Sequence, residues 1–284
     1  MPAMRMTRAA SDRVAQARVP APHPSPLPAA AGRGRDPRQR EGEGPAPAPQ
    51  AARECASRTK GALYRLLAWL SPGFPVGAYS YSHGLEAAAA DGRIADRASL
   101  ESWIEAILVF GGGRLDADIL ARAYRAAAAG DLAALIEVNR CGVAFRATAE
   151  MALEATAPGE AFLAQLCAAW PIPFIERCAA ALAGEPVAYA AAFGAAAGAA
   201  GVALDDALLG FLEAMAANLV SAALRLGVVG QTDGQRILAA LEPAIAAAAA
   251  SAIERGEDEF GAAAFAVELA SMAHETQYSR LFRS

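Results

Sequence analysis

The chain contains a single lysine, Lys60, among its 284 residues. A phosphate-binding loop of the GxxxxGK[ST] type needs a lysine directly after a glycine, because this lysine reaches the phosphates. Lys60 precedes a glycine instead, so the sequence excludes a P-loop GTPase or ATPase. The run Gly111-Gly112-Gly113-Arg114 resembles an anion-binding loop only superficially, since no strand-like segment precedes it, and we interpret it as a break between two helices.

Histidine and cysteine are also scarce, with three and four residues respectively. No histidine has a second histidine or a cysteine at helical ligand spacing, and the segment from His274 to Tyr278 lacks the second histidine of an HExxH motif. The cysteines form no CxxC pair and no disulfide-framework pattern, which favours small buried thiols in a reducing cytoplasm. The sequence therefore predicts a cytoplasmic protein with no metal site and no cofactor. The cysteines are Cys55, Cys141, Cys167 and Cys178.

Proline and charge are distributed unevenly along the chain. Ten of the 17 prolines lie between Pro2 and Pro49, where aliphatic and aromatic residues are almost lacking. Residues 1–60 carry 11 basic and 5 acidic residues, whereas residues 61–284 carry 14 and 25. We predict a disordered Pro/Ala/Arg-rich extension over residues 1–60 and one domain over residues 61–284. The acidity of that domain argues against nucleic-acid binding.

Alternating Val, Ile and Thr runs long enough for a strand are absent after residue 60, and apolar residues recur there at helical spacing. Between Leu204 and Leu219 they follow one another at steps of three and four, which places them on one helix face. Ser99 is predicted to cap another helix, and Pro158-Gly159 and Pro243 are interpreted as helix ends. The fold class is therefore all-α, a single compact globular bundle of roughly nine or ten helices.

One segment, residues 186–204, has the length of a membrane span and carries no charge. It consists mostly of Ala and Gly, which contribute little to membrane insertion, and it contains Gly194-x-x-x-Gly198. We interpret it as a helix of a soluble protein that packs closely against a neighbouring backbone, and we predict no membrane association.

A helical enzyme is the main alternative from another functional class. Ser82 and His83 are adjacent, and a carboxylate from elsewhere in the chain would complete a nucleophilic triad. The same residues also suit a turn that leads into a helix. No further residue pattern in the sequence indicates an active site.

Three segments have the composition of surfaces, and the first is the loop, Ser71 to Glu86. Its prolines and glycines exclude a helix through Gly77. Phe74, Tyr79 and Tyr81 either pack into the core or form a stiff aromatic surface for a partner, since tyrosine supplies contact area at low entropic cost.

The second segment is the turn, Gln231 to Gln235. Thr232 and Gln235 match a T-x-x-Q capping box and would start a helix at Arg236. This interpretation leaves Gln231 and Asp233 without a structural role.

The third segment is the tail, residues 272–284, in which aromatic, apolar and cationic side chains lie close together. It either closes the last helix over the core, with Arg280 and Arg283 near the negative end of the helix dipole, or projects as an anchor for a partner. In the second case the arginines would bind partner carboxylates.

Together, the loop, the turn and the tail resemble the urease accessory protein F family. The resemblance covers residues 62–284, and the tail and the GQTDGQ turn are its most specific parts. Two departures are Val228-Val229, where the family often has a proline, and Ala273, where a basic or polar residue is common. The matching segments are Ser71-Pro72, Pro75-x-Gly77, Gly84-Leu85-Glu86, Ser221, Arg225-Leu226, Gly230 to Gln235, Met272 and His274 to Ser284.

The resemblance implies an all-helical, non-enzymatic, cytoplasmic scaffold or chaperone that acts in nickel insertion into urease. It further implies a homodimer that binds accessory protein D, called H in some organisms, and recruits or regulates the GTPase accessory protein G. That complex would act on apo-urease while G hydrolyses GTP.

By the same resemblance, Tyr79 and Arg280 are expected at partner contacts, and the tail is expected to become ordered when a partner binds. We assign a partner-binding role to other residues of the three segments as well. The full set is Tyr79, Glu86, Gln231, Asp233, Gln235, His274, Glu275, Tyr278, Arg280, Leu281 and Phe282.

Overall fold

The computed structural model describes the backbone of residues 50–284 and the side chains of residues 60–284. Most of the predicted extension, residues 1–49, lies outside the described residues. Helix α1 (Gln50–Trp69) begins within the range that was predicted to be disordered. Residues 50–284 belong to one compact unit, which is the part described below.

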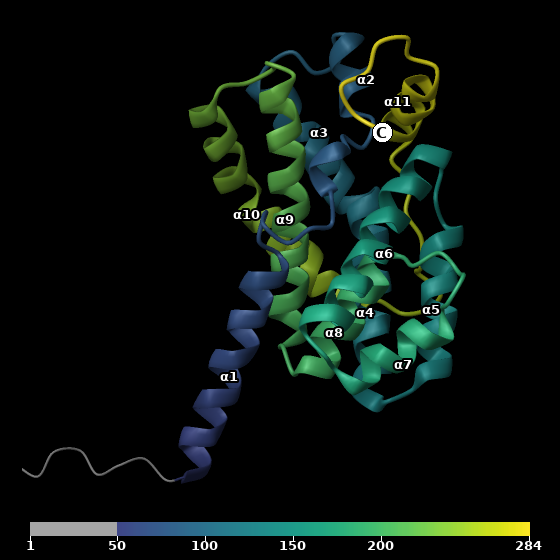
Figure 1. The fold of residues 1–284 in the computed structure, drawn as a ribbon. Helices are drawn as coiled ribbons and strands as arrows, with labels where there is room; N and C mark the ends of the chain where they lie inside the picture. Colours follow the sequence, from purple (N-terminus) through teal and green to yellow (C-terminus); the bar gives the residue numbers. More distant parts are fainter. Residues whose placement is uncertain (1–49) are drawn as a thin grey trace, which may run out of the picture. The chain divides into compact units, whose positions relative to one another are not determined.

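The described residues contain α-helices, one short 3₁₀ helix and no strand, which confirms the all-α fold class (Figure 1). They form eleven α-helices, slightly more than predicted, partly because the six-residue α2 fits between two turns. After α1, the elements are η1 (Ala78–Ser80), α2 (Leu85–Ala90), α3 (Arg97–Val109), α4 (Gly112–Ala129), α5 (Leu132–Ala144), α6 (Ala149–Ala169), α7 (Pro173–Ala181), α8 (Tyr189–Ala200), α9 (Leu204–Arg225), α10 (Gln231–Glu254) and α11 (Phe265–Glu275).

The centre of the unit is the packing of α8 against α4. A Cβ atom on Gly194 would lie 2.4 Å from the carbonyl oxygen of Leu120, and one on Gly198 would lie 2.5 Å from that of Tyr124. The two backbones therefore meet where only glycine fits. This confirms the interpretation of the uncharged segment as a closely packed helix, and residues 190–197 are all buried.

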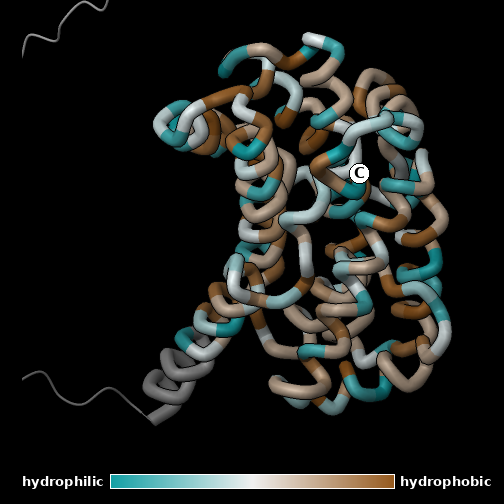
Figure 2. The backbone as a smooth tube through the Cα atoms, turned by 45° about the horizontal axis from the view of Figure 1, so that its top comes forward, coloured by the Kyte–Doolittle hydropathy of each residue, from teal (hydrophilic) through white to brown (hydrophobic). Residues whose placement is uncertain are grey.

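Two other helices, α9 and α10, are long and apolar enough to cross a membrane by length and composition alone. Core helices of soluble proteins meet the same criterion. Half of the most apolar stretch of α9 is buried inside the unit, and α9 packs against α10, α4 and α8. Along the helices, hydrophobic and hydrophilic residues alternate every few positions (Figure 2), as in helices that bury one face.

Several predicted helix boundaries were wrong. Pro158-Gly159 lies inside α6. Gly159 lets this helix approach the backbone of residues 187–189, because a Cβ atom on Gly159 would lie 2.0 Å from the Val187 carbonyl oxygen. Pro243 lies inside α10. In α3, Asp96 is the N-cap and Ser99 is the N3 residue, and the two form a capping box.

The predicted capping box of the turn was also wrong. Helix α10 begins at Gln231 after the extended residue Gly230, so Thr232 and Gln235 both lie within its first turns. No side-chain cap is formed at this end. Gly234 instead brings α10 close to α9, since a Cβ atom there would lie 2.9 Å from a side-chain carbon of Val220.

Candidate functional site: the loop and the tail

The loop is shaped by two glycines in the left-handed region. Gly77 and Gly84 both have φ of 75°, and η1 lies between them. The structure divides the loop aromatics between the two predicted roles. Tyr81 is buried at 2% exposure and Phe74 packs on Phe162 with ring centroids 5.2 Å apart, whereas Tyr79 is 70% exposed.

The tail folds back onto the loop after α11 ends. The amide of Arg283 donates to the Ser80 carbonyl oxygen at 2.8 Å, and the amide of Ser82 donates to the Ser284 carbonyl oxygen at 3.1 Å. Phe282 is the buried anchor of this segment. Because α11 ends at Glu275, Arg280 and Arg283 lie outside its last turn, so the predicted contact with the helix dipole was wrong.

Arg225, at the end of α9, joins the loop to the tail. Its Nη1 donates to the Tyr79 carbonyl oxygen at 2.6 Å, and its guanidinium carbon lies 4.4 Å from the centre of the Phe282 ring. A guanidinium over an aromatic face is attracted by the ring quadrupole. The end of α9 therefore contacts both segments at once.

Glu86 is buried and binds the tail from α2. Its Oε1 accepts the amide of Leu281 at 2.7 Å, and its Oε2 accepts the amide of Phe282 at 2.9 Å. Nε2 of His274 lies 3.1 Å from the same Oε2. One carboxylate thus accepts from two successive backbone amides of the tail, of which that of Phe282 is buried.

His274 is fully buried between two carboxylates. Its Nδ1 lies 2.6 Å from Oε2 of Glu150, on α6, and Oε1 of Glu150 accepts from Nη1 of Arg280 at 2.7 Å. Both ring nitrogens lie within hydrogen-bonding distance of carboxylate oxygens. Helix α11, helix α6 and the tail are joined through this ring.

A second buried histidine, His83, lies under the end of the tail. Its Nδ1 lies 3.2 Å from Oε2 of Glu154, which also accepts from the Ser284 hydroxyl at 2.9 Å. Burial lowers the pKa of His83, but the charge of Glu154 and the hydrogen bond to it outweigh burial, so the pKa lies above its usual value. Among the described residues its Nε2 has no hydrogen-bond partner and lies against Gly112.

The geometry does not assemble the alternative triad of Ser82, His83 and a carboxylate. The buried Ser82 hydroxyl donates to the Ser284 carbonyl oxygen and accepts from the amide of Glu86 at 3.3 Å. The His83 ring contacts Glu154 instead, and in residues 60–284 no hydrogen bond joins it to the Ser82 hydroxyl. The two side chains are adjacent in sequence but serve separate contacts.

A cavity of about 500 Å³ lies between the loop and helices α6, α8 and α9. One end is polar and includes His83, Glu154 and the ion pair of Asp116 with Arg146, whose atoms lie 2.7 Å apart. The space leaves the inner side of the loop incompletely packed. Its aromatic walls are Trp69, Phe74, Tyr79, Tyr81, Tyr189 and Phe211.

The predicted partner-binding residues therefore fall into three groups. Glu86, His274 and Phe282 are buried in contacts within this chain. Five residues of the loop, α11 and the tail are exposed around them: Tyr79, Glu275, Tyr278, Arg280 and Leu281.

The third group is the turn, which forms the start of α10. Gln231 and Gln235 are exposed, and Asp233 pairs with Arg236 at 3.0 Å. Within the described part of the chain, no hydrogen bond or ion pair joins these three residues to the loop or the tail. The structure thus brings the loop and the tail together but not the turn.

Sequence reasoning missed two acidic residues of the site, Glu150 and Glu154. They are four residues apart after the cap residue Thr148, so they share one face of α6. That spacing was the available signal, but nothing in it indicates a histidine partner far along the chain.

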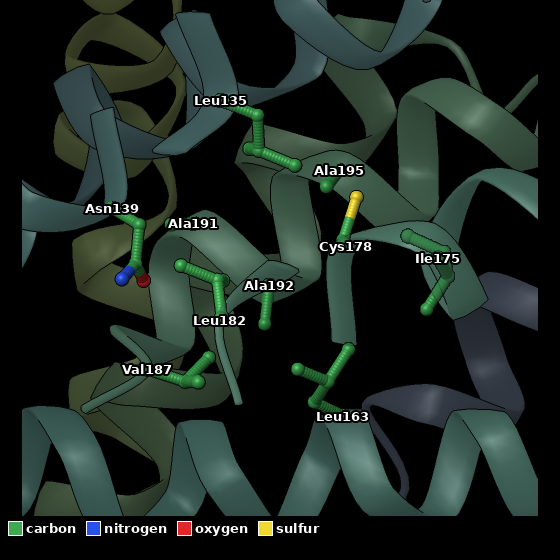
Figure 3. Close-up of a pocket in the computed structure, with 10 residues that line it drawn as sticks. All are labelled: Leu135, Asn139, Leu163, Ile175, Cys178, Leu182, Val187, Ala191, Ala192 and Ala195. Carbon is green, nitrogen blue, oxygen red and sulfur yellow. The ribbon is translucent and has the colours of Figure 1, made fainter. Parts of the chain in front are cut away.

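The three cysteines whose side chains the structure describes do not take part in this site. Cys141, Cys167 and Cys178 are free, and the side chain of Cys55 lies outside the described ones. Cys178 lines an apolar space of about 10 Å³ among α5, α6, α7 and α8 (Figure 3), and burial raises its pKa to about 11. Since the thiolate is the reactive form, Cys178 is an inert core residue, as predicted.

The fold and the site define a class of protein: an all-helical protein with an ordered loop and tail that present aromatic and basic side chains. Tyr79 and Tyr278 are exposed, and Arg280 keeps 40% of its side chain in solvent. Exposed Tyr and Arg side chains are enriched where proteins bind proteins.

Comparisons with known proteins identify the family. The UreF family model matches residues 94–242. A urease accessory protein UreF from Xanthobacter autotrophicus is 49% identical over 223 residues, which cover 78% of this chain and 91% of that protein. One from Azorhizobium caulinodans is 50% identical over 219 residues, which cover 77% and 94%. The chain therefore belongs to the UreF family of urease accessory proteins, which confirms the resemblance found in its sequence.

Proposed function

We propose that this protein is a non-enzymatic, cytoplasmic scaffold of urease maturation, which acts with accessory proteins D (H) and G in the GTP-dependent insertion of nickel into apo-urease. The observation that supports this proposal is the loop and tail surface. Its buried side is held by Glu86, His274 and Phe282, while Tyr79, Tyr278 and Leu281 face outward. The tail is already ordered in the single chain, which differs from the expectation that it becomes ordered when a partner binds. An ordered surface of this kind binds a partner with little further loss of conformational entropy.

The tail and the loop are the proposed contacts for the D and G proteins. Arg280 uses one guanidinium nitrogen for Glu150, which leaves the rest of its donor fork for a partner carboxylate. Tyr79 and Tyr278 supply exposed aromatic area. Tyr79 and Tyr278 can therefore be changed without removing a side-chain contact to Glu86 or Glu150, whereas Arg280 also pairs with the buried Glu150.

The experiment is co-expression of this chain with the D and G proteins, followed by size-exclusion chromatography and an assay of nickel-loaded urease. An Arg280→Ala/Tyr278→Ala variant should stay folded, elute without the G protein and fail to support urease activation. Arg97→Ala, which changes an exposed arginine of α3, is the matched control. Full recruitment and activation by the double variant would contradict the proposed surface. A chain that neither copurifies with the D and G proteins nor is needed for nickel-loaded urease would refute the function.

The proposed assembly unit is a homodimer. Helix α1 exposes Leu63, Tyr64 and Leu67, which lie on one stretch of helix. A second copy of the chain would cover this apolar surface. Light scattering after size exclusion tests it, and a Leu67→Glu variant should shift the mass to that of one chain if α1 lies in the dimer contact.

A further inference from the structure

The cavity between the loop and helices α6, α8 and α9 has the size and composition of a small-molecule site. Its volume of about 500 Å³ lies within the range of about 300–1,000 Å³ that is typical of ligand sites. Aromatic rings form much of its apolar wall, and polar side chains lie together at one end. Small-molecule sites combine an apolar wall with a few polar groups in this way.

The aromatic wall is held in place by packing within the core. Tyr189 of α8 lies 5.5 Å from Phe162 and 5.3 Å from Phe211, measured between ring centroids. Phe162 also packs on Phe74 of the loop at 5.2 Å and on Trp69 at 6.3 Å. The wall is therefore formed before a ligand enters, and little entropy is lost in ordering it.

Four oxygen atoms that line the cavity have no hydrogen-bond partner in the described part of the chain. Asp116 pairs with Arg146 through Oδ1 alone, so its Oδ2 has no partner there. Glu154 accepts hydrogen bonds through Oε2 alone, so its Oε1 has none either. The other two atoms are the hydroxyl oxygens of Tyr81 and Tyr189.

The two hydroxyls lie in the field of the two carboxylates. Burial raises the pKa of Tyr189, and the charge of Asp116 raises it further. Burial also raises the pKa of Tyr81, where the charge of Arg283 opposes the shift and that of Glu154 adds to it. The tyrosines and the carboxylates therefore share the polar end of the cavity.

The ionisable side chains of the cavity carry an excess of negative charge. Arg146 is the one guanidinium among the described residues that line it, and His83 is already paired with Glu154. Against these stand three carboxylates, those of Asp116, Glu154 and Glu213. The excess is two charges when His83 is neutral and one when it is protonated. A cation offsets this excess, whereas an anion adds to it.

We propose that this cavity binds a small organic cation, a primary ammonium group with an aromatic or alkyl body. An ammonium group has three donors and no acceptor, which matches a set of acceptor oxygens without partners. The body of the ligand fits the aromatic wall, whose rings also attract a cation. Such binding goes beyond the scaffold function proposed above and does not depend on it.

The test is a ligand-observed NMR titration of the full chain with phenethylamine. We expect a dissociation constant on the order of 1 mM or below, a strength that ligands of this size can reach. Phenethyl alcohol and hydrocinnamate keep the ring but lack the positive charge, and both should bind roughly tenfold more weakly or worse. Absence of amine binding, or equal binding of the amine and the alcohol, overturns the proposal.

Two conservative variants test the polar end. Glu154→Gln removes one negative charge, keeps the volume of the side chain and should weaken amine binding roughly tenfold. Tyr189→Phe removes one hydroxyl, keeps the ring and should weaken it roughly threefold. Glu160→Gln, an exposed change in the same helix as Glu154, is the matched control and should bind the amine like the wild-type chain. Unchanged affinity in a folded Glu154→Gln protein overturns the proposal.

A further variant covers failure of Glu154→Gln to fold. Ala217 of α9 lines the cavity and is half-buried. Ala217→Phe places a ring in the space and changes no residue of the polar end, so it should abolish amine binding. Wild-type affinity in this variant would mean that the amine binds elsewhere, and it would also overturn the proposal.

Discussion

Two glycines of the loop have the same backbone angle but different surroundings, so alanine substitutions separate strain from crowding. Gly77 and Gly84 both have φ of 75°. A Cβ atom at Gly77 would have no neighbour within 4 Å. At Gly84 it would lie 2.8 Å from the backbone nitrogen of Ser271 and 3.2 Å from the carbonyl oxygen of Val267, both in α11. Backbone atoms cannot rotate away, so α11 would have to move.

The expected free energies of unfolding follow from these distances. A non-glycine residue in the left-handed region costs about 1–2 kcal/mol, and this cost applies to both variants. Overpacking against a fixed neighbour adds about 1–3 kcal/mol, and it applies only to Gly84→Ala. We therefore expect a loss of about 1–2 kcal/mol for Gly77→Ala and about 2–5 kcal/mol for Gly84→Ala. The smaller entropy of the unfolded state affects both variants alike and cancels in the comparison.

Urea unfolding followed by circular dichroism measures both values. Tryptic cleavage after Arg280 and Arg283 reports whether the tail has detached, since Gly84 lies between Ser82 and Glu86, which bind the tail. Gly84→Ala should be cleaved faster than Gly77→Ala in the absence of denaturant. Equal stability of the two variants would refute the reasoning, because it would mean that α11 does not rest on the loop at this point.

Three further changes have defined outcomes. Because the pKa of His83 is raised, its pair with Glu154 contributes its full stabilisation below pH 6.5 and loses it as the pH rises through the folded-state pKa. The free energy of unfolding of the wild-type chain should therefore exceed that of His83→Gln by less as the pH rises. Urea unfolding at several pH values measures this difference, and a difference that grows with pH would contradict the prediction. Trypsin should cleave the tail of Arg225→Lys as fast as that of Arg225→Ala, because a lysine cannot both stack on the Phe282 ring and reach the Tyr79 carbonyl oxygen. Full protection of the tail from cleavage in the lysine variant would show that the positive charge alone is sufficient. Gly194→Ala should lower the free energy of unfolding by about 3 kcal/mol or more, and with it the thermal midpoint, because α8 and α4 must separate to make room for the Cβ atom. Calorimetry measures the midpoint, and an unchanged value would contradict the close packing.

Individual helices could be predicted where the signal lies in the spacing of residues within one segment. Apolar steps of three and four between Leu204 and Leu219 indicated α9, and the glycine pair of α8 indicated a close backbone contact. Boundaries were less predictable, because tertiary packing decided them. Pro158 and Pro243 lie inside helices. Helix α10 begins at Gln231, whereas the sequence predicted a capping box from Thr232 and a helix start at Arg236.

The candidate site was predictable as a set of segments but not as a set of roles. The composition of the loop and the tail marked both as unusual surfaces, yet Glu86 and His274 were assigned to partners although they contact each other. They are 188 residues apart, and no local pattern links them. Of the aromatic residues in the tail, Tyr278 is fully exposed, whereas Phe282 is buried and contacts Arg225 of α9, which is distant in sequence. Whether any of these residues touches a partner stays a prediction.

The tail is attached to the rest of the protein mainly through polar contacts. Phe282 is its one buried large apolar side chain, while Tyr278 and Leu281 face solvent, so the tail buries little apolar area. Its position is fixed mainly by directional contacts to Glu86, Glu150 and Glu154. Buried ionic contacts add little net stability, because desolvation offsets their attraction, but they penalise every alternative register. A segment held in this way has one defined docked position, because any other position leaves the buried Glu86 and Glu150 carboxylates without these partners.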